Sequence, residues 1–225
     1  MFWANARMNG RCASLGVKRM KQAIAVFLSA VLCLLCAGCG GVSLPQRIDE
    51  TTEPQTTAFV VAAPSETQVR TAFEKALEVY GWFELCSLDS DSADKAEREG
   101  AVYYRVLSDE VPTYDVLRTL VYDLFDTTTG DALLREDDST PPYIDVNGAL
   151  YGQDFARGSD VEKGEYELTV EQESKTCFLC KVRVETLEFN DGYKEYRRVS
   201  GYEDYTYHYR LVGNRWVFTD FDLFY

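Results

Sequence analysis

The fold of this chain is decided by residues 202–224, which have the sequence YEDYTYHYRLVGNRWVFTDFDLF. Gly213-Asn214 is a favoured two-residue hairpin turn, so the segments before and after it should pair as antiparallel strands. The expected cross-strand pairs are Leu211–Trp216, Tyr209–Phe218 and Tyr207–Asp220 on one face, with Arg210–Val217 and His208–Thr219 on the other. Aromatic pairs of this kind stabilise a sheet by about 0.2–1 kcal/mol each.

Further strands are predicted upstream of this hairpin. Apolar and polar residues alternate around Tyr166–Val170 and again over Phe178–Val184, which is typical of strands with one buried and one solvated face. Tyr143–Val146 and Ala149–Tyr151 flank Asn147-Gly148, a second favoured hairpin turn. Additional predictions are a strand at Ala101–Leu107, a short strand at Trp82–Leu88 and a turn at Asn190-Asp191-Gly192.

Two amphipathic helices are predicted in the first half of the chain. The first begins after Ser65, which has capping-box spacing to Gln68, and should end at Gly81 in a left-handed cap. Its apolar stripe consists of Val69, Ala72, Phe73, Ala76, Leu77 and Tyr80. Pro112-Thr113 opens the second helix, with the stripe Val116, Leu117, Leu120, Val121, Leu124 and Phe125.

The segments around these helices carry weaker signals. Thr127–Gly130 should break the second helix, and Asp131–Arg135 can add one more helical turn. Asp89–Gly100 is highly charged and is predicted to be an exposed loop or a frayed helix. Helices followed by antiparallel strands define the α+β class, with N-terminal helices packed on a curved, mostly antiparallel sheet in one domain.

Cys39 carries the clearest functional signal. Lys18, Arg19 and Lys21 precede the apolar run Ala23–Leu35, which is shorter than the roughly 20 residues that a membrane-spanning helix needs. Small residues then lead to Cys39, as in a bacterial lipoprotein signal peptide. We therefore expect cleavage before Cys39 and lipid attachment to its sulfur. Position 36 departs from the lipoprotein pattern, because it is Cys where Leu is usual.

The expected organisation is a signal peptide at 1–38, a lipidated cysteine and flexible linker at 39–58, and an extracytoplasmic domain at 59–225. Met20 is a second start candidate that leaves a complete signal. The linker would have a root-mean-square reach of roughly 25 Å. Two alternatives stay open for the leader: an uncleaved anchor, since the uncharged run continues to about Gln46, and a plain secreted protein.

The charge balance limits the possible partners. From Cys39 onward the chain has 18 basic and 37 acidic side chains. Such a field opposes binding to nucleic acid or anionic lipid heads and favours a basic partner, although an acidic surface also simply keeps a protein soluble. We predict no nucleic-acid binding.

No residue pattern predicts catalysis. Cys177 and Cys180 are three apart on a strand and should point to opposite faces, so we expect structural thiols, with a disulfide from Cys86 to one of them as an alternative. His208 is the only histidine, which disfavours metal sites and nucleophile–histidine systems. Asp89–Asp94 lacks the glycine of a calcium loop. We predict no catalytic residues, no metal and no cofactor.

Several segments resemble the IseA-type D,L-endopeptidase inhibitors of Gram-positive bacteria. They are Val102–Val106, the helix opened by Thr113-Tyr114, and Tyr143–Tyr151. The resemblance covers about residues 65–225. It implies a non-enzymatic domain that blocks peptidoglycan-cleaving NlpC-type cysteine peptidases, here held at the outer face of the cell membrane by the lipid on Cys39. It assigns no inhibitory residue to this chain.

The alternative is a cystatin-like or nuclear-transport-factor-like module that encloses a small ligand. The ligand- or partner-binding residues would then be Tyr207, His208 and Asp220, beside the last hairpin. A deep pocket at these residues would favour this alternative, whereas a filled core would argue against it.

The lipidation hypothesis makes one direct prediction. Cys39→Ser should abolish both processing and retention in the membrane fraction, because the lipid would be attached to the missing sulfur. Detergent partition and electrophoretic size of the full chain would measure this, with Cys36→Ser as the control that should be processed normally. Unchanged size and retention in Cys39→Ser would contradict lipidation at this position.

Overall fold

The computed structural model describes residues 61–158, 160–189 and 197–225. Cys39, the linker and the predicted turn at residues 190–192 lie outside these ranges. The described residues belong to one compact unit, Val61–Tyr225. The elements, in chain order, are α1 (Glu66–Glu84), β1 (Ser90–Arg98), β2 (Ala101–Val106), α2 (Tyr114–Leu124), α3 (Thr127–Leu134), β3 (Tyr143–Val146), β4 (Ala149–Gly152), β5 (Lys163–Ser174), β6 (Cys177–Phe189), β7 (Arg197–Val212) and β8 (Arg215–Phe218).

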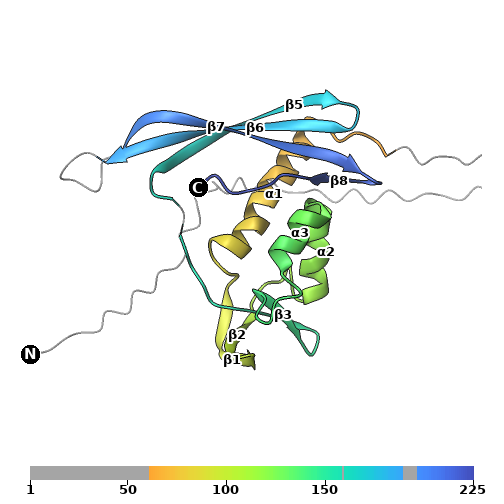
Figure 1. Ribbon diagram of the computed structural model, residues 1–225, viewed down its shortest axis with the longest axis vertical. Coiled ribbons are helices and arrows are strands. Elements are labelled where there is room, and N and C mark those ends of the chain that lie inside the picture. Colours follow the sequence, from red (N-terminus) through yellow and green to blue (C-terminus); the bar gives the residue numbers. More distant parts are fainter. Residues whose placement is uncertain (1–60, 159, 190–196) are drawn as a thin grey trace, which may run out of the picture. The chain divides into compact units, whose positions relative to one another are not determined.

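The α+β class is confirmed, but the strands form two sheets rather than one. The first four strands pair in the order β1-β2-β4-β3, and the last four pair in the order β5-β6-β7-β8. All pairings within the sheets are antiparallel. The three helices lie on one side of the β5–β8 sheet (Figure 1).

The C-terminal hairpin has the predicted register. Leu211 pairs with Trp216, and Tyr209 pairs with Phe218. The ladder continues one step further, because the Thr219 N–H donates to the His208 carbonyl at 3.2 Å. The Tyr143–Tyr151 hairpin is also confirmed, with positive φ at both Asn147 and Gly148, as its turn requires.

The predicted helix starts are correct, but the predicted end of the first helix is wrong. Ser65 forms the expected capping box with Gln68, and Thr113 caps α2. Helix α1 continues through Gly81 to Glu84, so no strand forms at 82–88. Phe83 explains the extension: it falls on the buried face of the helix and packs edge-on against Tyr143, with the ring centroids 5.2 Å apart. This burial outweighs the cost of about 1 kcal/mol for a glycine inside a helix.

Two other segments differ from the prediction. Residues 90–98 form β1, because their backbone pairs with β2 even though their side chains are charged. Residues 127–130 do not end a helix but begin α3, since the Asp126 carboxylate caps it by accepting from the Thr129 N–H at 2.9 Å. The predicted extra turn at 131–135 is the end of this helix.

Tyr143 connects the first sheet to the end of α1. Its hydroxyl donates to the Trp82 carbonyl at 2.8 Å and accepts from the Leu88 N–H at 3.1 Å. Its ring lies against Gly152, where a Cβ would come within 2.7 Å of it. A side chain at 152 would therefore displace the ring.

The main core lies between α1, α2 and the inner face of the β5–β8 sheet. Its residues include Val69, Phe73, Leu117, Val121, Cys180, Val182, Val184, Tyr207, Phe218, Phe221 and Phe224. Phe221, just after β8, has the most ring neighbours: Phe73, Tyr80, Phe125, Tyr207 and Phe218, with centroids 4.9–5.7 Å away. Phe221 therefore joins both long helices to the sheet.

Removing this ring should destabilise the unit strongly. We expect Phe221→Ala to lower the free energy of unfolding by about 3–5 kcal/mol, because it leaves a cavity among five rings. Urea unfolding of the full chain would measure this. Val212→Thr, at a half-exposed position in β7, is the control and should change stability by less than about 0.5 kcal/mol. A similar small effect for Phe221→Ala would contradict this account of the core.

Candidate functional site

The structure brings together two of the three residues predicted to bind a ligand. Asp220 lies beside His208 and bonds it twice: its Oδ1 accepts from the His208 backbone N–H at 2.8 Å, and its Oδ2 contacts the imidazole Nδ1. Both side chains are partly exposed. Asp220 therefore fixes the imidazole and also holds the chain that follows β8 against β7.

Tyr207 lies on the opposite face of β7, because neighbouring residues on a strand alternate. Its side chain is buried in the core, with ring centroids 5.4 Å from Phe73 and 4.9 Å from Phe221. Desolvation by this burial raises the pKa of its hydroxyl. Tyr207 thus contributes to packing, and the surface beside His208 and Asp220 does not include it.

A bonded His–Asp pair is half of the arrangement that activates a nucleophile. The third member would be a hydroxyl or thiol on the free imidazole nitrogen. Within the described ranges, no serine, threonine or tyrosine hydroxyl is hydrogen-bonded to His208. In this geometry the His208–Asp220 pair holds the segment that follows β8 against β7.

The two strand cysteines lie on opposite faces of β6, as predicted. Cys180 is fully buried in the core, and Cys177 is buried on the other face. Both are free thiols, so neither is bonded to Cys86. Burial raises the pKa of Cys180 to about 12, and it also raises the pKa of Cys177. A nucleophilic cysteine needs a lowered pKa, so these two thiols have the opposite of the required chemistry.

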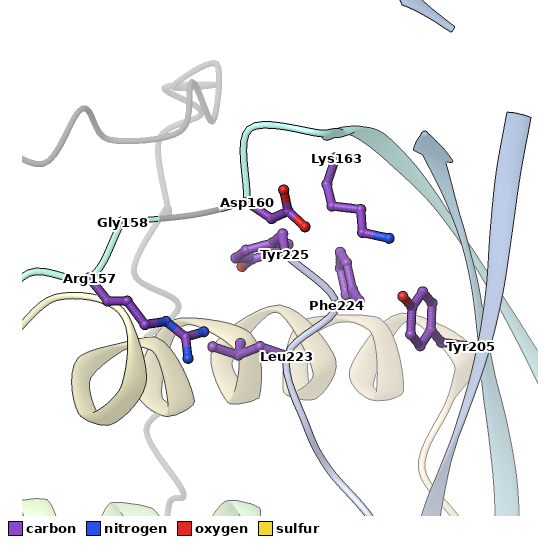
Figure 2. A pocket seen from close by; sticks show the side chains of 8 residues that line it. All are labelled: Arg157, Gly158, Asp160, Lys163, Tyr205, Leu223, Phe224 and Tyr225. Atoms are coloured by element: carbon purple, nitrogen blue, oxygen red, sulfur yellow. The ribbon is translucent and has the colours of Figure 1, made fainter. Parts of the chain in front are cut away.

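A cavity of about 390 Å³ lies next to the C-terminal segment (Figure 2). Its walls are Arg157, Gly158, Asp160, Lys163, Tyr205, Leu223, Phe224 and Tyr225. The apolar side consists of Leu223 and the aromatic rings. The ring centroid of Phe224 lies 5.9 Å from that of Tyr205 and 4.7 Å from that of Tyr225. Two cationic side chains and one carboxylate supply the polar side. Volumes near 300–1,000 Å³ are typical of small-ligand sites.

One wall of this cavity is held by a small polar network. Glu203 accepts a hydrogen bond from the Tyr205 hydroxyl at 2.5 Å and contacts the Lys163 ammonium. These bonds lower the pKa of Glu203 and raise that of Lys163. Arg157 comes from the loop after β4, and its guanidinium points toward Leu223 (Figure 2).

Sequence analysis missed this cavity. Arg157 and Asp160 lie after β4 in a stretch that carries no motif, Lys163 begins β5, and Leu223 and Phe224 were predicted to end the last strand. In the structure the last strand ends at Phe218, and the chain then turns under β7. The aromatic residues Phe218, Phe221 and Phe224 are three apart, which is not the two-residue alternation of a continuing strand, but they gave no direct signal of this turn.

The acidic segment Asp89–Asp94 leads into and begins β1. Asp91 accepts from the Ala93 N–H at 2.9 Å, and Asp94 accepts from the Tyr151 hydroxyl at 2.7 Å. Among the described residues, no group of three or more His, Cys, Asp or Glu side chains is placed to hold a metal ion. In this part of the chain, no helix is both long and apolar enough to cross a membrane.

No protein-family model matches the chain, and no curated protein is significantly similar to it.

The Glu203 network predicts a defined pH dependence. Because its folded-state pKa is lowered, Glu203 stabilises the fold above its ordinary pKa of 4.5, and this contribution is lost as the pH falls through the lowered value. Glu203→Gln should therefore lower the Tm at pH 7, and the difference from wild type should shrink between pH 4.5 and pH 3. Glu97→Gln, at an exposed position without an ion pair among the described residues, is the control for the loss of one carboxylate. A Tm difference for Glu203→Gln that stays constant down to pH 3 would contradict this role.

Proposed function

We propose that this protein is a lipid-anchored, extracytoplasmic, non-enzymatic binding protein that restrains a basic cell-wall hydrolase. The lipid on Cys39 would hold it at the outer face of the cell membrane. The hydrolase class follows from the resemblance to D,L-endopeptidase inhibitors. The linker would allow the domain to search the space near the membrane.

The observation that carries this proposal is the acidic surface of the domain. Residues 61–225 contain 34 acidic and 17 basic side chains, a formal charge of −17. None of the charged side chains in the described ranges is buried, so the charge acts outward into the solvent. Surfaces of this kind speed the encounter with a partner of opposite charge and repel anionic polymers.

The chemistry of the described residues also supports binding over catalysis. The thiols of Cys177 and Cys180 are buried, and their pKa values are raised. The one imidazole is fixed by Asp220, and the described hydroxyl groups do not bond to it. A binding protein needs none of these groups to react.

An inhibition assay tests this function. The full chain, held in detergent micelles, should slow peptidoglycan cleavage by a purified basic D,L-endopeptidase at micromolar concentration. Because the attraction is electrostatic, inhibition should weaken as salt rises from about 50 to 500 mM. Heat-unfolded protein at the same concentration is the control. No inhibition of several such enzymes from one host would contradict the proposal.

The cavity of Figure 2 favours one second function, the binding of a small ligand. Its volume fits such a ligand, and Arg157 with Lys163 beside an aromatic wall suits a carboxylate on an apolar body. This function would place the ligand away from His208, unlike the predicted site.

A further inference from the structure

The outer face of the β5–β8 sheet contains a second hollow, of about 420 Å³. It is lined by Glu165, Tyr166 and Glu167 of β5, Arg183 and Glu185 of β6, and Tyr202 of β7. Val182 and Val184 alternate with Arg183 and are buried in the core, so Arg183 points to the opposite face. The helices lie on the core side, so no described element covers this face (Figure 1).

Strand register explains why these side chains meet. Glu167 pairs with Arg183, and Glu185 pairs with Tyr202, so three adjacent strands contribute to one patch. The register shifts between Lys163 and Tyr166. Gly164 lies in this irregular stretch, and a Cβ there would come within 2.7 Å of the Glu185 carboxylate. The glycine thus leaves room for this carboxylate, which accepts from the Glu165 N–H at 3.3 Å.

The hollow already holds one cation against an aromatic wall. The Arg183 guanidinium lies over the Tyr202 ring, 4.4 Å from its centroid. Tyr202 is 53% exposed, so its ring keeps surface open to solvent. Tyr166 pairs with the buried Val184, and its ring centroid lies 5.1 Å from that of Phe224 on the core side of the sheet, so its ring does not face the hollow. Among the described residues, neither Glu165 nor Glu167 has a side-chain ion pair, and Arg183 has none. Three carboxylates against one guanidinium leave the hollow net acidic.

We propose that this hollow receives a lysine or arginine side chain of a basic partner protein and anchors it. The carboxylates would accept its N–H donors, and the exposed Tyr202 ring would contact its charge and its methylene stem. Aromatic side chains beside a pocket are typical of residues that dominate binding energy. A second copy of this chain is a poor occupant, because both surfaces carry the same sign of charge. This inference rests on the proposed function, which supplies the basic partner.

Matched variants test the hollow in the full chain. The hollow variant is Glu165→Gln/Glu167→Gln/Glu185→Gln. The control variant is Glu97→Gln/Asp137→Asn/Asp138→Asn. It removes three negative charges at exposed positions outside the hollow. These positions lie in residues 61–156, which are also acidic, with 20 acidic and 7 basic side chains. The control therefore separates local recognition from the overall field. Thermal unfolding would verify that both variants fold like wild type.

The probe is a fluorescein-labelled peptide of five residues, alternating lysine and valine, measured by fluorescence anisotropy. We expect the hollow variant to bind it about tenfold more weakly than wild type, and the control variant to bind within about twofold of wild type. Tyr202→Ala, at an exposed position, should weaken binding about fivefold by removing the aromatic wall. Equal binding by the hollow and control variants, or no binding by wild type, would overturn the inference.

The same variants in the endopeptidase assay keep the two proposals distinguishable. If wild type inhibits and the hollow variant loses inhibition about tenfold more than the control, both proposals stand. If wild type and the hollow variant inhibit equally, the proposed function stands and the hollow is not the anchor. If wild type does not inhibit, the proposed function fails, and the peptide measurement alone decides whether the hollow binds a cation.

Discussion

The packing of Phe221 among five aromatic rings is the interaction on which the rest of this structure depends. Its ring contacts Phe73 and Tyr80 of α1, Phe125 after α2, and Tyr207 and Phe218 of the sheet. The bonds from Asp220 to His208 hold the chain at the position where this ring turns inward. Without that turn, the C-terminal segment would not reach the wall of the first cavity, and the helices would lose their shared contact with the sheet.

This apolar core also determines how the surface is used. The described interior holds no charged side chain, so a chain with twice as many acids as bases in residues 61–225 must carry them outside. Such a surface costs some stability through repulsion, which the aromatic packing offsets. The rings on the inner face of the sheet therefore stabilise the fold, while Glu165, Glu167 and Tyr202 on its outer face are exposed to solvent.

Sequence alone predicted the parts of the fold that local rules control. The register of the last hairpin followed from Gly213-Asn214, and the start of α1 followed from Ser65 and Gln68. The errors arose where tertiary contacts override local preference. Phe83 carries α1 past Gly81 by packing on Tyr143, and backbone pairing with β2 makes a strand of charged residues 90–98. The break predicted at Thr127–Gly130 was wrong for a different reason. Asp126 is a local N-cap residue, and it could have predicted the start of α3 from sequence.

The candidate sites were less predictable, because they join residues distant in sequence. The hairpin register predicted a Tyr207–Asp220 pair, which does not form. Because β8 ends at Phe218, Asp220 instead bonds to His208, while Tyr207 lies in the core. Neither hollow was anticipated. Arg157 and Lys163 meet Phe224 only through the fold, and Glu165, Arg183 and Tyr202 meet only once three strands are aligned.

The central claim is that an acidic, membrane-tethered domain captures a basic partner by charge. The association rate constant of the vesicle-bound full chain with a purified basic D,L-endopeptidase, measured by stopped-flow fluorescence across ionic strength, tests it most directly. The account predicts a rate constant that falls at least about tenfold between 0.05 and 0.5 M salt, as expected for electrostatic steering. A rate constant that is independent of salt, or an enzyme that does not associate at all, would contradict it.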